Sequence, residues 1–178
     1  MKIGFCGTMS VGKTTLVNEL KKLPEFKDYT FRTERSKYLK EMGIPLNTDS
    51  TIKGQTIFLA ERTSELMQEN IITDRTVIDV MAFTKCSKSI PHWVKLDFCS
   101  YAHWLLDEYD YIFYVSPKGV EIEDNGVRET DLDYRNLIDE TILELMNDQH
   151  PSLTFYKIEG TMEERITSIK ETIFPQYV

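Results

Sequence analysis

The sequence predicts a single α/β domain with a central parallel sheet of about five strands, helices on both faces of the sheet, and a lid segment. A glycine-framed loop, GTMSVGKTT at 7–15, connects an apolar strand-like run to an amphipathic helical run. Short apolar runs then alternate with helical patterns along the 178 residues, without repeats or low-complexity segments. This alternation favours a parallel sheet in three layers, because helices that connect parallel strands cover both faces of the sheet.

Each strand is predicted from a short apolar run bounded by polar or turn residues. In chain order these runs are MKIGF at 1–5, YTFRTE at 29–34, a run that ends at Asp74, YDYIFYVSP at 109–117, and LTFYKIEG at 153–160. The helices, predicted from their periodicity, cover about 13–23, 35–42, about 50–69, 94–108, about 131–147 and 161–173. The segment at about 117–130 is polar and contains glycine, and we interpret it as a lid. No internal boundary is visible, so residues 1–178 are expected to form one domain.

The composition excludes several classes of protein. A hydrophobic fraction of 41% with 28% charged residues is typical of a soluble domain, and no apolar run is long enough to span a bilayer. No secretory signal is visible, and the three cysteines have no metal-ligand spacing, so we expect free thiols in a reducing cytoplasm. The formal net charge of −8 disfavours a long duplex as a partner and favours a small or short substrate. The composition leaves homo-oligomerisation open.

The glycine-framed loop fits GxxxxGK[ST], the P-loop pattern, with Gly7, Gly12, Lys13 and Thr14 at the defining positions. The glycines permit a tight turn whose N–H groups point at an anion, at the positive end of the following helix. We expect Lys13 to reach the β- and γ-phosphates of ATP or another nucleoside triphosphate, and the Thr14 hydroxyl to bind Mg²⁺. The predicted nucleotide-binding residues are Gly7, Thr8, Met9, Ser10, Val11, Gly12, Lys13, Thr14 and Thr15, with Gly160 and Thr161 after the last strand.

Carboxylates and arginines follow the next two strands, at the edge where a parallel sheet binds its ligands. Glu34 is a candidate general base for an alcohol acceptor, or else a cap of the next helix. Asp74 would be costly at the end of an apolar strand without a partner, and Mg²⁺ held together with Thr14 supplies one. Arg75 is a candidate catalytic ligand of phosphate, or else one member of a structural Asp–Arg pair. Asp79 is a candidate substrate residue, with capping or support of Arg75 as the alternative.

Three further arginines and a glutamine complete the candidates. Gln55 and Arg62 share one helix face with two leucines, so they either reach the surface or converge on a substrate. Arg35 is predicted to bind the substrate beside the end of the second strand. In the lid, Arg128 is predicted to enter on closure and to stabilise charge on the transferring phosphoryl group.

Together these motifs resemble the nucleoside and nucleotide kinase superfamily of P-loop proteins, and within it small phage-encoded kinases related to the ribosylnicotinamide kinase domain of NAD-salvage proteins. The shared segments are GTMSVGKTT, TERSKYL, DRTVID, YDYIFYVSP, DNGVR and IEGTMEER, which extend over nearly the whole chain. The narrowest resemblance is to vibriophage 5′-hydroxyl DNA kinases that prefer very short, even dinucleotide, substrates. One departure is that many superfamily members have Glu-Arg-Ser after the third strand, where this chain has Asp74-Arg75-Thr76.

The resemblance implies a three-layer P-loop kinase fold and ATP-dependent transfer of the γ-phosphate to the 5′-OH of short DNA. It assigns the phosphates and Mg²⁺ to Lys13, Thr14, Asp74, Arg75 and Arg128, and it places Glu34 near the acceptor. Within the kinase class, the alternatives are a nucleoside, ribosylnicotinamide or deoxynucleoside monophosphate kinase. From a different class, the alternative is a nucleotide-hydrolysing switch, although the NKxD signature of guanine-specific switches is missing from the sequence.

Overall fold

The computed structural model describes residues 1–33, 35–120, 131–148 and 154–175. Its centre is a sheet of five strands in the order β2-β3-β1-β4-β5, and every neighbouring pair is parallel. The strands are β1 (Lys2–Cys6), β2 (Thr30–Arg32), β3 (Ile71–Thr73), β4 (Tyr111–Val115) and β5 (Phe155–Ile158). The predicted α/β fold with a parallel sheet of five strands is therefore confirmed.

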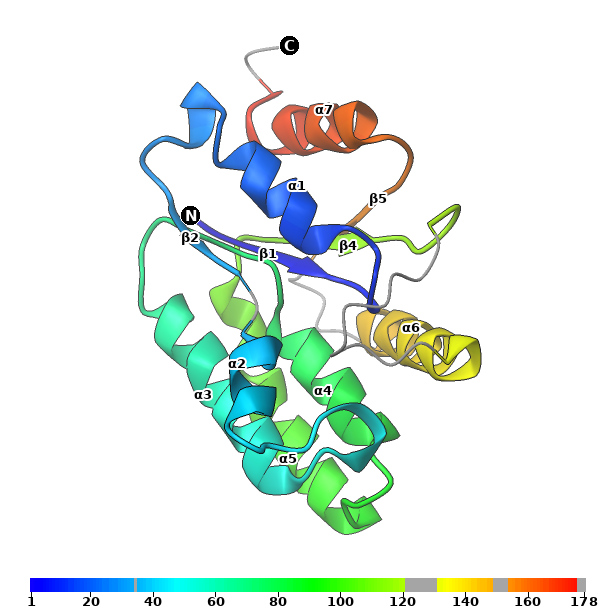
Figure 1. Cartoon of the computed structure of the whole chain (residues 1–178). Helices are drawn as coiled ribbons and strands as arrows, with labels where there is room; N and C mark the ends of the chain where they lie inside the picture. Colours follow the sequence, from blue (N-terminus) through cyan, green and yellow to red (C-terminus); the bar gives the residue numbers. More distant parts are fainter. Residues whose placement is uncertain (34, 121–130, 149–153, 176–178) are drawn as a thin grey trace.

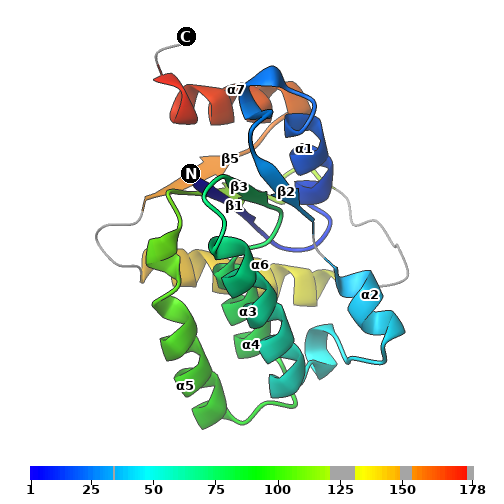
Figure 2. The ribbon, with the colours of Figure 1, turned by 90° about the vertical axis from the view of Figure 1, so that its left-hand side faces the viewer.

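Helices cover both faces of the sheet, as Figures 1 and 2 show. One face carries α1 (Lys13–Leu20) and α7 (Met162–Ile173). The other face carries α2 (Ser36–Glu41), α3 (Ile52–Leu66), α4 (Val77–Cys86), α5 (His92–His103) and α6 (Leu132–Asn147). Short 3₁₀ turns occupy parts of the connections: η1 (Pro24–Phe26), η2 (Asn47–Asp49) and η3 (Leu106–Glu108). The architecture has three layers, as predicted.

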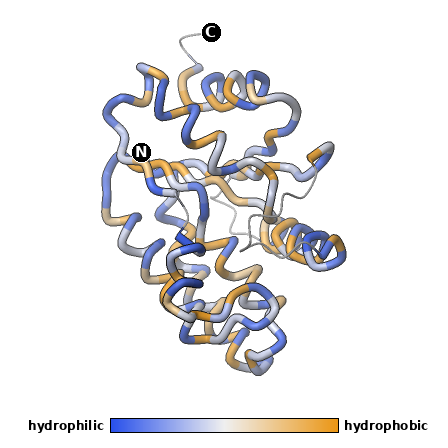
Figure 3. Tube along the Cα trace, viewed as in Figure 1, coloured by the Kyte–Doolittle hydropathy of each residue, from blue (hydrophilic) through white to orange (hydrophobic). Residues whose placement is uncertain are grey.

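Each face of the sheet has its own hydrophobic core, which explains why the strands read as continuous apolar runs. On the face of α1 and α7, Leu16 and Ile169 belong to one cluster with Phe5 and Phe113, whose stacked rings lie 5.4 Å apart. On the other face, buried side chains of α3, α4, α5 and α6 form the second cluster. Figure 3 shows the apolar residues along the central strands, while the outer helices alternate between apolar and polar residues. Burial on both faces therefore makes the sheet a rigid platform.

Helix α4 has no counterpart among the predicted helices. Residues 77–84 are all buried, because α4 packs between α3, α5 and α6. A helix without an exposed face shows no amphipathic period, so the pattern that identifies surface helices is missing here. The predicted helix at 94–108 also differs: α5 already ends at His103, and the rest of that stretch contains η3.

The functional residues lie beyond the carboxyl ends of the strands. β1 pairs with β3 on one side and with β4 on the other, so the segments that follow these strands meet at one edge of the sheet. These segments are the P-loop after β1, the turn into α4 after β3, and the residues after β4. Within the described ranges, the model contains no helix that is both long and apolar enough to cross a membrane.

Candidate functional site

The P-loop has the backbone conformation for which its glycines are needed. Gly7 and Gly12 have positive φ angles of 147° and 85°, and Ser10 between them has a φ of 58°. A Cβ on Gly7 would come within 2.7 Å of the carbonyl oxygen of Val115, and Gly12 is the left-handed N-cap residue of α1. L-residues with a side chain rarely adopt such angles, so the loop depends on glycine at both positions.

Lys13 is folded back over this loop. Its Nζ donates to the carbonyl oxygens of Gly7, at 2.5 Å, and Thr8, at 2.8 Å. Burial lowers the pKa of the Lys13 ammonium, against the opposing effect of the nearby Asp79 carboxylate. A phosphate oxygen in the cavity would offer this ammonium a stronger, charged partner in place of neutral carbonyls.

Thr14 and Asp74 form the second polar contact of the site. The Thr14 hydroxyl donates to Oδ2 of Asp74 at 2.5 Å, and Asp74 is buried. A hydroxyl and a carboxylate oxygen form a donor set that suits Mg²⁺, which takes one or two protein ligands and completes its shell with water and phosphate oxygens. The described residues contain no cluster of three or more His, Cys, Asp or Glu side chains able to hold a metal. The residues present fit the expected ion.

Asp79 caps α4 and contacts the P-loop. Its Oδ2 accepts from the backbone N–H of Thr76 at 2.8 Å, and the Thr76 side chain completes a capping box. Its Oδ1 accepts from the N–H of Gly7 at 3.3 Å. Asp79 also lines the main cavity. The geometry therefore gives Asp79 the capping role, which the sequence analysis named as the alternative. Direct contact of Asp79 with a substrate stays a prediction.

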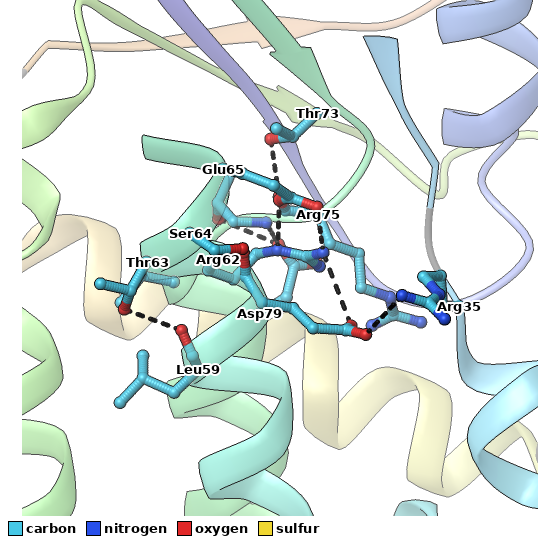
Figure 4. Close-up of polar contacts among 12 residues, drawn as sticks. Arg35, Leu59, Arg62, Thr63, Ser64, Glu65, Thr73, Arg75 and Asp79 are labelled. Atoms are coloured by element: carbon cyan, nitrogen blue, oxygen red, sulfur yellow. Dashed lines mark hydrogen bonds and ion pairs between the residues drawn. The ribbon is translucent and has the colours of Figure 1, made fainter. Parts of the chain in front are cut away.

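Arg75 lies in the wall of the same cavity. Its guanidinium carbon lies 4.9 Å from the ring centre of Phe83, over the face of the ring. The backbone carbonyl of Arg75 accepts from the hydroxyl of Thr73 at 2.8 Å, as Figure 4 shows. These contacts fix the start of the turn and leave the guanidinium at the cavity surface.

Arg62 differs from its predicted role. Its side chain is only 2% exposed and forms two hydrogen bonds to Glu65, Nε to Oε2 and Nη2 to Oε1, both at 2.7 Å (Figure 4). Arg62 is not among the described residues that line the cavity. The structure thus gives Arg62 a buried ionic partner on its own helix, in place of the expected substrate contact.

Arg35 also lies outside the described cavity lining. Its side chain is 56% exposed, contacts Glu61 at 3.5 Å and stacks over Tyr38, 4.7 Å from the ring centre. Gln55, in contrast, is buried and lines the cavity. Of the two polar residues predicted on this face of α3, only Gln55 therefore reaches the cavity within the described structure.

Within the described structure, one cavity connects the P-loop with Asp74, Asp79 and Gln55. P-loop residues from Met9 to Thr14 line it, together with Asp74, Arg75 and Asp79, and we call these residues the charged lining. The other lining residues are neutral, and two of them are aromatic: Ser36, Leu46, Asn47, Gln55, Phe58, Val80 and Phe83. We call this second group the neutral lining.

The remaining predicted residues lie outside this lining or outside the described ranges. Thr8 is buried against α6, and Thr15 is exposed on α1. Gly160 and Thr161 follow β5, where Thr161 caps α7 through a capping box with Glu164. The candidate base Glu34 and the lid arginine Arg128 lie outside the described residues.

A comparison with protein families decides the family of this chain. The model of a family described as an AAA domain matches residues 2–165. The chain belongs to this AAA domain family. No curated protein sequence matches the chain.

Solved structures share the fold of this AAA domain. A deoxyadenosine kinase from M. mycoides, described with products dCMP and dCDP bound, has a TM-score of 0.70 at 20% identity, with 99% of this chain and 100% of that chain covered. Thymidylate kinase from Candida albicans has a TM-score of 0.66 at 17% identity, with 98% and 91% covered. The YorR protein from Bacillus subtilis, described in complex with phosphorylated GDP, has a TM-score of 0.60 at 16% identity, with 99% and 98% covered. The chain therefore has the P-loop fold of nucleotide kinases.

Two buried arginines of the chain were absent from the sequence-based candidates. Arg135 on α6 and Arg165 on α7 both donate to carbonyl oxygens of the P-loop. A signal existed in the sequence, because each arginine lies on the buried face of its helix: Arg135 precedes Ile138 by three positions, and Arg165 precedes Ile169 by four. A charge in an apolar stripe calls for a buried polar partner.

Proposed function

We propose that the protein is an ATP- and Mg²⁺-dependent kinase that transfers the γ-phosphate to a single nucleoside or nucleotide unit. One observation carries this proposal. The same cavity is lined by the P-loop, with Lys13 and the Thr14–Asp74 pair, and by the neutral residues Phe58, Phe83 and Gln55. A donor phosphate and an organic acceptor can therefore occupy the same cavity.

The charged lining of the cavity supplies the groups that phosphoryl transfer requires. P-loop N–H groups and Lys13 bind the phosphates, and Thr14 and Asp74 would hold Mg²⁺. When bound, Mg²⁺ neutralises charge that develops on the phosphate oxygens. Because phosphoryl transfer depends mainly on positioning and charge, the charged lining has the groups needed to bind the donor nucleotide.

The neutral lining of the cavity suits a nucleobase. Phe58 and Phe83 offer aromatic surface to a flat ring, and the Gln55 amide offers both a donor and an acceptor to its edge. The kinases of deoxyadenosine and of thymidylate that share the fold support an acceptor of one nucleoside unit.

We favour an uncharged nucleoside as the acceptor. Besides Lys13, Arg75 is the one cation among the described residues that line the cavity. The 5′-hydroxyl oxygen would attack the γ-phosphorus, its proton would pass to Glu34, and ADP would leave. The proposed entry of Arg128 adds positive charge at the transferring group.

A nucleoside monophosphate is the second candidate, and the position of Arg75 favours it. A guanidinium in the cavity wall, 4.9 Å from the Phe83 ring centre, presents a planar fork suited to an acceptor phosphate. Transfer to the 5′-OH of short DNA, which the sequence resemblance implies, requires that the cavity mouth admit a second nucleotide.

Transfer of labelled γ-phosphate from ATP to a panel of acceptors tests these readings. The panel holds nucleosides, nicotinamide riboside, deoxynucleoside monophosphates and 5′-OH DNA of two to twelve nucleotides, each with and without Mg²⁺. Label on a nucleoside supports the favoured reading, and label on a monophosphate supports the second. Label on short DNA alone would overturn both readings and support transfer to the 5′-OH of short DNA, as the sequence resemblance implies. Rapid release of labelled phosphate to water, unchanged by every acceptor, would overturn the kinase in favour of a nucleotide-hydrolysing switch.

A further inference from the structure

We propose that Arg135 and Arg165 are positioning residues for the donor nucleotide: they hold P-loop carbonyls turned outward, so that the amides on the other side of the same peptides face the phosphates. Both side chains come from helices that flank the loop, α6 and α7. Donor binding at the P-loop is all that these roles require, so they do not depend on the identity of the acceptor.

Arg165 connects the P-loop to the residues after β5. Its Nη1 donates to the carbonyl oxygen of Val11 at 2.8 Å, and its Nε donates to that of Gly160 at 3.0 Å. The side chain passes directly beneath the loop, since a Cβ on Gly12 would lie 3.6 Å from Nη1 of Arg165. The residue is only 5% exposed. One guanidinium thus holds two loops that are far apart in the sequence.

Arg135 makes the equivalent connection on the other side. Its Nε donates to the carbonyl oxygen of Met9 at 3.3 Å, and its Nη1 donates to that of Val120 at 2.9 Å. The contact is reciprocal, because the Thr8 hydroxyl donates to the backbone carbonyl of Arg135 at 2.9 Å. Arg135 is 6% exposed, and its Nη2 has no hydrogen-bond partner within the described structure. The start of α6 is therefore docked on the P-loop from two directions.

Because the peptide bond is planar, a contact that fixes the direction of a carbonyl also fixes the direction of the N–H on the same peptide. In a trans peptide the C=O and the following N–H point in opposite directions. The model contains no cis peptide bond among the described residues. When Arg135 holds the Met9 carbonyl outward, the N–H of Ser10 is directed to the opposite side, and Arg165 does the same for Val11 and the N–H of Gly12. Ser10 and Gly12 both line the cavity.

The charge balance agrees with an anionic ligand. Burial lowers the pKa of the Arg165 guanidinium. Burial also lowers the pKa of Arg135, partly offset by the charge of Asp139. Two buried cations behind the loop, bound mainly to neutral carbonyls, retain attraction for a triphosphate in front of it. The free-energy cost of burying the two cations in the nucleotide-free protein is thus offset when the donor nucleotide binds.

Binding of ATP and of inorganic tripolyphosphate, measured by calorimetry with Mg²⁺, tests these roles. Arg165→Met and Arg135→Met remove the donors, and Arg165→Lys keeps the charge while it can satisfy only part of the geometry. Lys170→Met is the matched control, because it removes a cation from α7 whose recorded partner, Glu25, lies away from the loop. We expect each Met variant to weaken both ligands about tenfold or more, since hydrogen bonds to charged groups have this size, with Arg165→Lys intermediate and Lys170→Met unchanged.

Tripolyphosphate separates positioning of the loop from recognition of the nucleoside, because it has neither base nor ribose. Thermal unfolding of each variant separates a local effect from loss of the fold. If Arg165→Met and Arg135→Met bind tripolyphosphate as tightly as Lys170→Met does, the two arginines do not position the loop. Should a Met variant fail to fold, the corresponding Lys variant decides: unchanged tripolyphosphate affinity overturns the inference, and a weakened affinity in a folded Lys variant supports it.

Discussion

The hydroxyl of Thr14 donates a hydrogen bond to Oδ2 of Asp74 at 2.5 Å, although 60 positions separate the two residues in the chain. The parallel pairing of β1 with β3 produces this contact, because it brings the start of α1 beside the end of β3. We propose that this pair holds Mg²⁺ beside the donor phosphates.

Replacement of Asp74 by Asn should abolish the response to Mg²⁺. The amide keeps the size of the side chain but removes the negative charge, so we expect kcat to fall by about 100-fold or more at saturating ATP. The measurement is the rate of phosphate transfer during a Mg²⁺ titration. Asp97→Asn, an exposed position on α5, serves as the control and should leave the titration unchanged. An Asp74→Asn enzyme with the wild-type Mg²⁺ dependence would exclude Asp74 from the metal site.

Arg62 should matter for stability and not for substrate affinity. Arg62→Met leaves the buried carboxylate of Glu65 without its partner, and such a loss costs roughly 3–5 kcal/mol of unfolding free energy. The double variant Arg62→Met with Glu65→Met should recover much of this loss, because it removes both charges. Urea unfolding of the single and double variants gives the comparison. A stable Arg62→Met protein whose acceptor KM is strongly raised would instead restore the substrate role predicted from the sequence.

Gln55 should determine acceptor affinity. Gln55→Leu preserves the volume of the side chain but removes the amide from the neutral lining of the cavity. We expect the acceptor KM to rise about tenfold, the effect of losing one or two buried hydrogen bonds, with the KM for ATP unchanged. Gln68→Leu, at an exposed position just beyond α3, provides the same exchange away from the cavity. Equal acceptor KM values for the two variants would place the acceptor elsewhere.

Asp139 should make stability depend on pH. Burial raises the pKa of its carboxyl group, and this effect outweighs the opposing hydrogen bond from the Tyr114 hydroxyl. Between the unfolded pKa of about 3.9 and the raised folded pKa, the folded protein binds more protons than the unfolded one, so stability falls as pH rises through this window. Asp139→Asn lacks this titration, and its stability relative to wild type should therefore increase with pH. Parallel stability curves for the two proteins from pH 4 to 8 would contradict the assignment.

The extent of sequence-based prediction differs from element to element. The P-loop was predictable because its requirements are local: Gly7 and Gly12 adopt positive φ angles that residues with a side chain rarely adopt. The surface helices were predictable from their period. Helix α4 was not, because every residue from 77 to 84 is buried and no period remains.

The candidate residues divide in the same way. Thr14 was predicted from the P-loop pattern, and Asp74, Arg75 and Gln55 from their positions at a strand end or on a helix face. The structure brings these four residues to one cavity. Arg62 was also predicted, but its nearest carboxylate lies on the adjacent turn of its own helix. Whether a polar side chain on an apolar face meets a ligand or a neighbouring side chain depends on packing, which spacing alone does not describe.

By itself, the sequence determined the parallel sheet, the phosphate-binding loop and the strand ends at which chemistry can occur, since these depend on local backbone preferences and on hydrophobic period. Only the tertiary structure decided the partners of the charged side chains: Asp79 with Gly7, Arg62 with Glu65, and Arg135 and Arg165 with the P-loop carbonyls. Buried charges and carbonyls must be satisfied by whatever lies next to them in space, and those neighbours come from distant parts of the chain.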